Sequence, residues 1–149
     1  MVSIFKSSEE FDKGAFQKVC ADNNISFPKE YIEFLELNND GELENNIICD
    51  FDDCAVDYFF GTTSESYSDF KENLEIYKGR MPELCIPIAE AEGGNLLCMS
   101  LDEKSYGTIL WWDHEIMDVD EGESCPYSIE DMHIIAENFG ELLSKIVPD

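Results

Sequence analysis

The chain has few basic residues. Among 149 residues there are 9 lysines and arginines against 34 aspartates and glutamates, which leaves a formal charge of −25. Two long windows, residues 30–70 and 105–144, contain no lysine or arginine at all. A field of this sign repels nucleic acid and anionic membranes and steers basic proteins toward the surface. We therefore expect no nucleic-acid partner and no membrane partner, although the same charge also suits a surface that is merely well solvated.

The chain also lacks long apolar runs. No segment approaches the roughly 20 apolar residues of a membrane helix, and residues 1–25 lack the apolar core of a secretory signal. We expect a cytoplasmic protein of one domain spanning residues 1–149. A domain of this length buries enough surface to fold without disulfides, so we expect all six cysteines to be reduced. These are Cys20, Cys49, Cys54, Cys85, Cys98 and Cys125.

No short catalytic motif is present: the chain has no G-x-S-x-G, no H-E-x-x-H and no phosphate-binding loop. It has only two histidines, His114 and His133. His114 is flanked by Asp113 and Glu115, but neighbours on a strand point to opposite faces, so both carboxylates cannot face the ring. We interpret His114 as a structural or partner-contacting residue and expect no catalytic residues.

Metal-ligand patterns are incomplete. Residues 118–122 imitate the start of a calcium-binding EF-hand loop, but the glycine stands at position five, and Ile129 occupies position twelve in place of glutamate. Cys49 and Cys54 have four residues between them and no second pair to complete a zinc site. We expect no metal and no cofactor.

The order of elements indicates an α+β fold with a central, mostly antiparallel sheet and helices at the N-terminus, middle and C-terminus packed on it. Apolar spacing predicts helices over 8–22, from Pro28 to Asn38, over 66–78, and from Ser128 to Ile146. Strand-like runs cover 47–49, 55–60, 84–89, 95–101 and 108–113, with a further strand over 115–119. The last three long runs are separated by glycine turns and predict an antiparallel meander. Pro87 predicts an edge strand or an interrupted ladder there.

The Trp111-Trp112 pair ends one predicted strand. On a half-buried strand one indole enters the core and the other faces solvent, where it can anchor a partner. A purely structural role for both tryptophans remains an alternative.

Three segments resemble the SUKH superfamily. The first runs from Phe27-Pro28 through Tyr31 and Phe34-Leu35 to Asn38-Asn39-Asp40-Gly41. The second, and most specific, contains Ile86-Pro87-Ile88, Gly93-Gly94-Asn95, Gly107 and Trp112-Asp113-His114-Glu115. The third is the closing segment 135–143. In bacteria the resemblance implies an immunity protein that binds and neutralises the toxin made beside it. Many such toxins are nucleases, whose phosphate-holding clefts are basic.

We expect the partner, a basic cognate toxin, to bind an acidic surface with an aromatic anchor. The candidate residues are Glu42, Glu44, Asp50, Asp52, Asp53, Asp57, Trp111, Trp112, Asp113 and Glu115. Two other functions stay open. One is an intracellular scaffold like the yeast cell-wall regulators of the superfamily, against which stands the lack of long extensions around the domain. The other is an enzyme, for which the two histidines would have to supply the general base.

Overall fold

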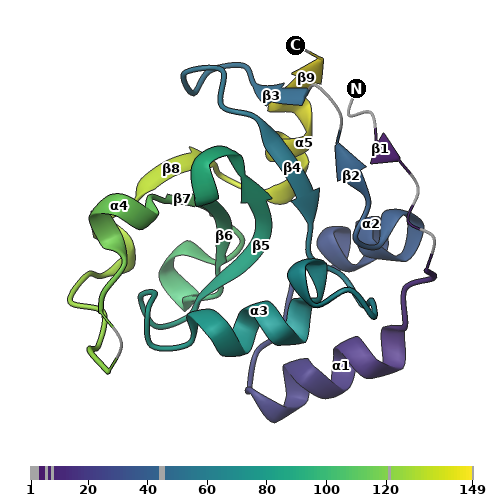
Figure 1. The fold of residues 1–149 in the computed structure, drawn as a ribbon, viewed down its shortest axis with the longest axis horizontal. Helices are drawn as coiled ribbons and strands as arrows, with labels where there is room; N and C mark the ends of the chain where they lie inside the picture. Colours follow the sequence, from purple (N-terminus) through teal and green to yellow (C-terminus); the bar gives the residue numbers. More distant parts are fainter. Residues whose placement is uncertain (1–3, 6, 8, 44–45, 121, 149) are drawn as a thin grey trace.

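The computed structural model describes residues 4–5, 7, 9–43, 46–120 and 122–148. A seven-stranded antiparallel sheet forms the centre of the fold in this part of the chain (Figure 1). Its strand order is β1-β2-β4-β5-β6-β7-β8. The strands are β1 (Ile4–Phe5), β2 (Glu42–Leu43), β4 (Val56–Phe59), β5 (Cys85–Ala91), β6 (Leu96–Ser100), β7 (Ile109–Trp112) and β8 (His133–Ala136). The predicted α+β class is confirmed.

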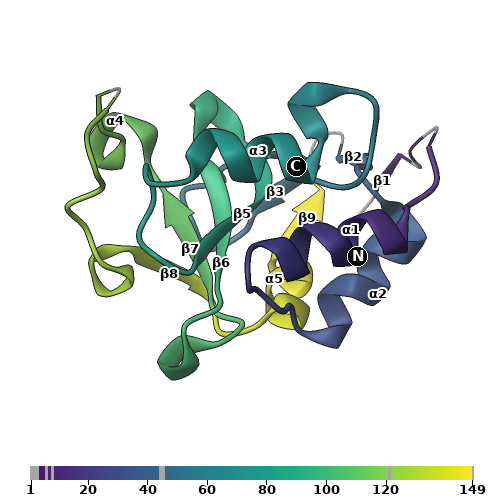
Figure 2. The same ribbon diagram turned by 90° about the horizontal axis from the view of Figure 1, so that it is seen from below.

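Helices cover both faces of this sheet (Figure 2). They are α1 (Lys13–Asp22), α2 (Lys29–Asn38), α3 (Phe70–Tyr77), α4 (His114–Met117) and α5 (Phe139–Lys145). On one face, Tyr77 of α3 packs edge-on against Trp112. On the other, Phe139 of α5 packs against Phe59 of β4 and Phe34 of α2. Because both faces are covered, the strands β5, β6 and β7 are almost entirely buried.

The β5-β6-β7 meander is confirmed, and it explains where proline is tolerated. Strand β5 is central, pairing with β4 and β6. Its register with β6 shifts between Pro87 and Ala89, so Ile88 lies in a bulge. Proline has no N–H to donate, and a bulge is a place where the ladder does not require one. The expected interruption is present at Pro87, within a central strand.

Buried Asn39 joins three segments. It adopts a positive φ of 50° and ends α2, as an asparagine at this position can. Its side chain donates to the carbonyls of Glu9 (3.0 Å) and Thr62 (2.9 Å) and accepts from the Thr62 N–H (2.8 Å). A Cβ at Gly61 would lie 2.2 Å from the Asn39 Oδ1, so this close approach requires glycine.

The first helix begins later than predicted. Helix α1 starts at Lys13, and the Asp12 side chain accepts from the Ala15 N–H at 3.0 Å. The Ser7–Glu10 spacing, which favoured an earlier start, is used differently, because the Ser7 hydroxyl donates to Asp40. An aspartate at the true cap satisfies a free N–H of the first turn as well as a serine would.

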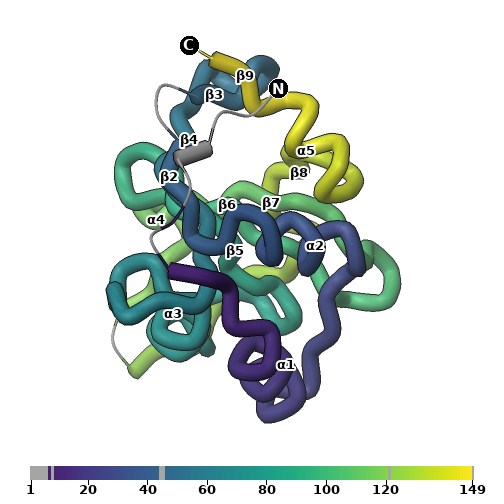
Figure 3. The backbone as a smooth tube through the Cα atoms, turned by 90° about the vertical axis from the view of Figure 1, so that its right-hand side faces the viewer, coloured from purple at the N-terminus to yellow at the C-terminus, as the bar shows by residue number. Residues whose placement is uncertain are grey.

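The C-terminal third differs most from the prediction. The single helix predicted from Ser128 is a short turn η4 (Ile129–Asp131), then β8, then α5. The Ser128–Asp131 capping box does form, but on that short turn. Of the residues predicted to form the buried stripe of that helix, Ile135 of β8, Phe139 and Leu142 of α5, and Ile146 after it are buried, and Leu143 is partly buried. A second sheet pairs β3 (Asn46–Ile48) with β9 (Ile146–Pro148), side by side in Figure 3.

Candidate protein-binding surface

The loop between β3 and β4 presents three exposed carboxylates, Asp50, Asp52 and Asp53, which we call the acidic loop. Asp52 and Asp53 adopt positive φ values of 48° and 50°, which aspartate tolerates better than most residues. The loop therefore turns tightly and leaves its carboxylates in solvent, as the sequence predicted. The Lys145 Nζ lies 2.9 Å from Asp50 Oδ2, so Asp50 is the one of the three whose charge is partly neutralised.

Phe51 fixes the acidic loop to the sheet. Its ring lies 4.8 Å from the Trp111 ring and 4.7 Å from the His133 ring, centroid to centroid. Trp111 and His133 are paired neighbours on β7 and β8, so both face the same side of the sheet. The carboxylates are thus carried by a loop with a defined position, which is the condition for presenting charge to a partner.

Further carboxylates lie beside the loop. Partial burial, a hydrogen bond with Glu92 and the charges of Asp52 and Asp53 together raise the pKa of the Cys54 thiol to about 11. Asp57 is exposed as a residue, yet local desolvation, followed by the charges of Glu90 and Glu92, raises the pKa of its carboxyl. Burial is the larger cause of both shifts, and the neighbouring carboxylates at this end of β4 and β5 act in the same direction.

The prediction of an exposed tryptophan is wrong. Trp111 is 8% exposed and Trp112 is 0% exposed. The two indoles do point to opposite faces, but Phe51 covers Trp111, and Tyr77 of α3 covers Trp112. The prediction assumed one solvent-facing side of the sheet, and this part of the sheet has none. Neither tryptophan is available as a surface anchor.

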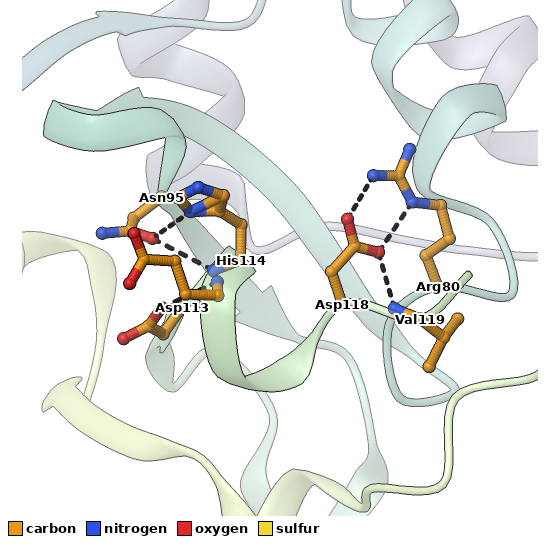
Figure 4. A network of polar contacts seen from close by, with 7 residues as sticks. Arg80, Asn95, Asp113, His114, Asp118 and Val119 are labelled. Carbon is orange, nitrogen blue, oxygen red and sulfur yellow. Dashed lines mark hydrogen bonds and ion pairs between the residues drawn. The ribbon is translucent and has the colours of Figure 1, made fainter. Parts of the chain in front are cut away.

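The predicted strand over 115–119 is also wrong, because α4 begins there. The Asp113 side chain accepts from the Glu115 N–H at 3.0 Å and caps this short helix. The His114 N–H and its ring Nδ1 both donate to Asn95 Oδ1, each at 3.0 Å (Figure 4). Gly94, with φ of 82°, lets the β5–β6 turn approach the ring, which lies 3.7 Å from a Cβ built there. The structural interpretation of His114 fits this geometry.

A charged pair holds the far end of α4. Arg80 donates to both carboxylate oxygens of Asp118, from Nε at 2.9 Å and from a terminal nitrogen at 2.5 Å (Figure 4). The guanidinium also lies 4.7 Å above the Tyr77 ring. The bond from Arg80 lowers the pKa of the Asp118 carboxyl below its ordinary value. Helix α4 is therefore fixed at both ends.

Ile116 is the residue that sequence reasoning missed here. It lies on α4 next to Glu115 and is 68% exposed. The mistaken strand assignment hid it, because alternation gave no reason for an isoleucine to face solvent. The Asp113 side chain, followed by an acidic first turn, was the available signal for a helix start.

The exposed residues of the predicted site lie on separate elements that hydrogen bonds connect. Glu92 donates its N–H to the Ala55 carbonyl, close to the acidic loop in the chain, and Asn95 accepts from the His114 N–H at the start of α4. Glu42 is exposed but lies on β2, opposite Tyr58, further along the sheet. Glu44 lies outside the described residues. Among the described residues, no three histidine, cysteine, aspartate or glutamate side chains are grouped to hold a metal.

Comparison with known proteins identifies the family. The chain belongs to the SMI1 / KNR4 family (SUKH-1), which it matches over residues 10–145. It is also 32% identical over 91 residues to the SPbeta prophage-derived uncharacterized protein YokK of Bacillus subtilis (strain 168). That alignment covers 61% of this chain and 41% of the relative, so the chain matches less than half of that protein's length. The described part of the chain contains no helix that is long and apolar enough to cross a bilayer.

Proposed function

We propose that this chain is an immunity protein that binds a cognate toxin domain in the cytoplasm and neutralises it by direct contact. Membership of the SUKH-1 family supports a role in a toxin system. The formal charge of −25 indicates which kind of toxin would be the partner. A basic domain is the complementary partner, and a nuclease is the toxin class whose substrate requires a basic cleft.

The acidic loop supports this proposal through its position. Its carboxylates are exposed, and the aromatic contacts of Phe51 hold the loop against β7 and β8. A charged surface that is already ordered attracts its partner without a further entropy cost for arranging the loop. Together with Asp57, Asp113 and Glu115, the loop offers the charge that accelerates encounter with a basic protein. Fast capture protects a cell when a single toxin molecule is enough to harm it.

In the proposed mechanism the chain neutralises the toxin by occupying its surface, and no chemical step takes place on the toxin. The partner residues we assign to it are Glu42, Asp50, Asp52, Asp53, Asp57, Asp113 and Glu115. An inhibitor of this kind acts at equal concentration with its target and is consumed by it. Its affinity must combine fast electrostatic association with slow dissociation, and dissociation depends on buried apolar contacts more than on charge.

The test is binding to the toxin domain encoded beside this chain's gene. We expect a dissociation constant in the nanomolar range, on the order of −12 kcal/mol, together with loss of toxin activity. Association should slow as salt increases, because exposed charges are screened over roughly 8 Å at physiological ionic strength. A purified chain that neither binds nor inhibits this domain would overturn the proposal.

A further inference from the structure

Four large apolar side chains that the described residues expose come from segments that meet at Tyr127, near the edge strand β8. They are Leu84 (38% exposed), Ile116 (68%), Tyr127 (36%) and Ile134 (59%), and we call them the Tyr127 band. They come from the residue before β5, from α4, from the segment after α4 and from β8. Sequence patterning gave no sign of this convergence, because the residues are spread over fifty positions of the chain.

Tyr127 connects the members of the band. Its hydroxyl donates to the carbonyl of Ile116 at 3.3 Å. Its side chain also borders two neighbouring grooves. One, of about 650 Å³, includes Leu84 and Pro82 in its lining. The other, of about 530 Å³, includes Ile134 and Leu110. Tyr127 therefore lies between two largely apolar hollows, a shape that accepts protruding side chains of another protein, and Ile116 is exposed beside them.

The band is held in place on several sides. The Arg80–Asp118 pair and the Asn95–His114 bonds fix α4, which carries Ile116. The Cys125 N–H donates to the Gly79 carbonyl at 2.9 Å and ties the segment before Tyr127 to the end of α3. Ile134 is paired with Leu110 in the sheet. Side chains ordered in advance lose little entropy when a partner covers them, which favours slow dissociation.

The charges around the grooves indicate which partner fits. Glu83 borders both grooves, and Lys78 also borders the groove of Leu84. Asp102, Glu130 and Lys104 border the groove of Ile134, so acidic residues outnumber basic ones around that groove. A second copy of this chain would bring another −25 of formal charge to the same surface, so self-association is opposed. A partner with apolar side chains surrounded by lysines and arginines is the complementary one.

We infer that the Tyr127 band is the apolar contact surface for the basic toxin domain, with Ile116 and Ile134 as its anchors. The inference rests on the proposed function and deepens it by naming the contact that sets the lifetime of the complex. The band replaces the exposed tryptophan that was predicted from the sequence as the apolar anchor for the partner. On β8, His133 faces the acidic loop through Phe51, and its neighbour Ile134 faces the opposite side, so the two surfaces meet at this strand.

The test compares two double variants against the toxin domain encoded beside this chain's gene. Ile116→Ser with Ile134→Thr removes the anchors, and threonine keeps the β-branch that suits a strand. Leu37→Ser with Ile76→Ser is the matched control, since both residues are exposed and lie on helices outside the band. We expect the band variant to dissociate at least about tenfold faster with association within about twofold of wild type. The control should change neither rate by more than about twofold.

Equal dissociation rates for wild type and the band variant would overturn the inference and leave the proposed function intact. No binding by wild type would overturn both. Hydrogen exchange on the unsubstituted complex tests the same surface without depending on the folding of a variant. We expect slower exchange of the amides around residues 116, 127 and 134 when the toxin domain binds, and unchanged exchange there would also contradict the inference.

Discussion

The acidic loop and the Tyr127 band border the same edge strand, β8, but they expose opposite chemistry. The loop exposes carboxylates and turns its aromatic residue toward the sheet, where partly buried Phe51 packs on Trp111 and His133. The band exposes its apolar residues and keeps its charged pair, Arg80 and Asp118, as support for α4. The comparison teaches that charge and apolar contact are divided between two surfaces. One surface is suited to attracting a partner, and the other to retaining it.

The largest expected change in stability comes from replacing the tryptophans. This replacement tests whether each indole belongs to the core or to one of the two surfaces. Replacing Trp111 or Trp112 with Ala should lower the free energy of unfolding by about 3–5 kcal/mol, because each leaves a large cavity. Urea denaturation monitored by circular dichroism measures this loss. Leu37→Ala is the control, and its effect should stay within about 0.5 kcal/mol because Leu37 is exposed. A tryptophan variant as stable as wild type would show that its indole belongs to a binding surface.

The next largest change in stability is expected at Arg80, which holds the end of the helix that carries Ile116. Arg80→Ala should lower the free energy of unfolding by about 1 kcal/mol at neutral pH, because a bidentate charged pair is lost at a partly exposed site. The pKa of Asp118 is lowered in the folded protein, so its contribution is present above the ordinary aspartate pKa and is lost as pH falls through the lowered value. The difference between wild type and variant should therefore shrink in acid. Lys18→Ala breaks an exposed pair with Asp22 and should change stability by less than about 0.5 kcal/mol.

The acidic loop should act on association alone. Changing Asp50, Asp52 and Asp53 to Asn should slow binding to the basic toxin domain by about threefold to tenfold at low salt and flatten the salt dependence, with dissociation nearly unchanged. Stopped-flow measurements at several salt concentrations give both rates. The matched control, Asp22→Asn with Glu33→Gln and Glu75→Gln, removes the same charge from the helices. Equal slowing by the two triple variants would show that only net charge matters, and that the loop is simply a solvated face.

The smallest effect is expected at Asp57. Its pKa is raised in the folded protein, so the ionised form destabilises the fold at neutral pH, and the penalty disappears as pH falls below the ordinary aspartate value. Asp57→Asn should therefore raise the free energy of unfolding at pH 7 by up to about 0.5 kcal/mol, and the gain should vanish in acid. Thermal unfolding at pH 7 and pH 3 measures both. A variant that is less stable than wild type at pH 7 would contradict this electrostatic account.

The sequence predicted the sheet well where local signals agreed. Glycine turns between three strand-like runs predicted the β5-β6-β7 meander, and the proline at position 87 predicted an interruption that the bulge provides. The first helix begins at Lys13 and not at residue 8, and the two misassigned elements lie between Asp113 and Lys145. There, apolar residues at helical spacing were compatible with a strand followed by a helix, and only pairing of β8 with β7 separates the two.

The candidate site was predictable in its charge and unpredictable in its apolar part. Exposure of Asp52 and Asp53 follows from the loop composition, because turn residues rarely bury carboxylates. Burial of both tryptophans depends on Phe51 and Tyr77, which are distant in the sequence. Exposure of Ile116 and Ile134 depends in the same way on the position of α4 and on the place of β8 at the edge of the sheet (Figure 1). Burial or exposure of these side chains is therefore determined by contacts between segments that are distant in the sequence.

A titration of toxin activity tests the central claim most directly. The toxin domain encoded beside this chain's gene is held at a concentration well above the expected dissociation constant, and its activity is measured as the purified chain is added. Neutralisation by direct binding predicts that activity falls in a straight line and reaches zero at a fixed molar ratio, whatever the incubation time. Activity that persists at excess, or that is removed by far less than an equal amount as time passes, would contradict the account.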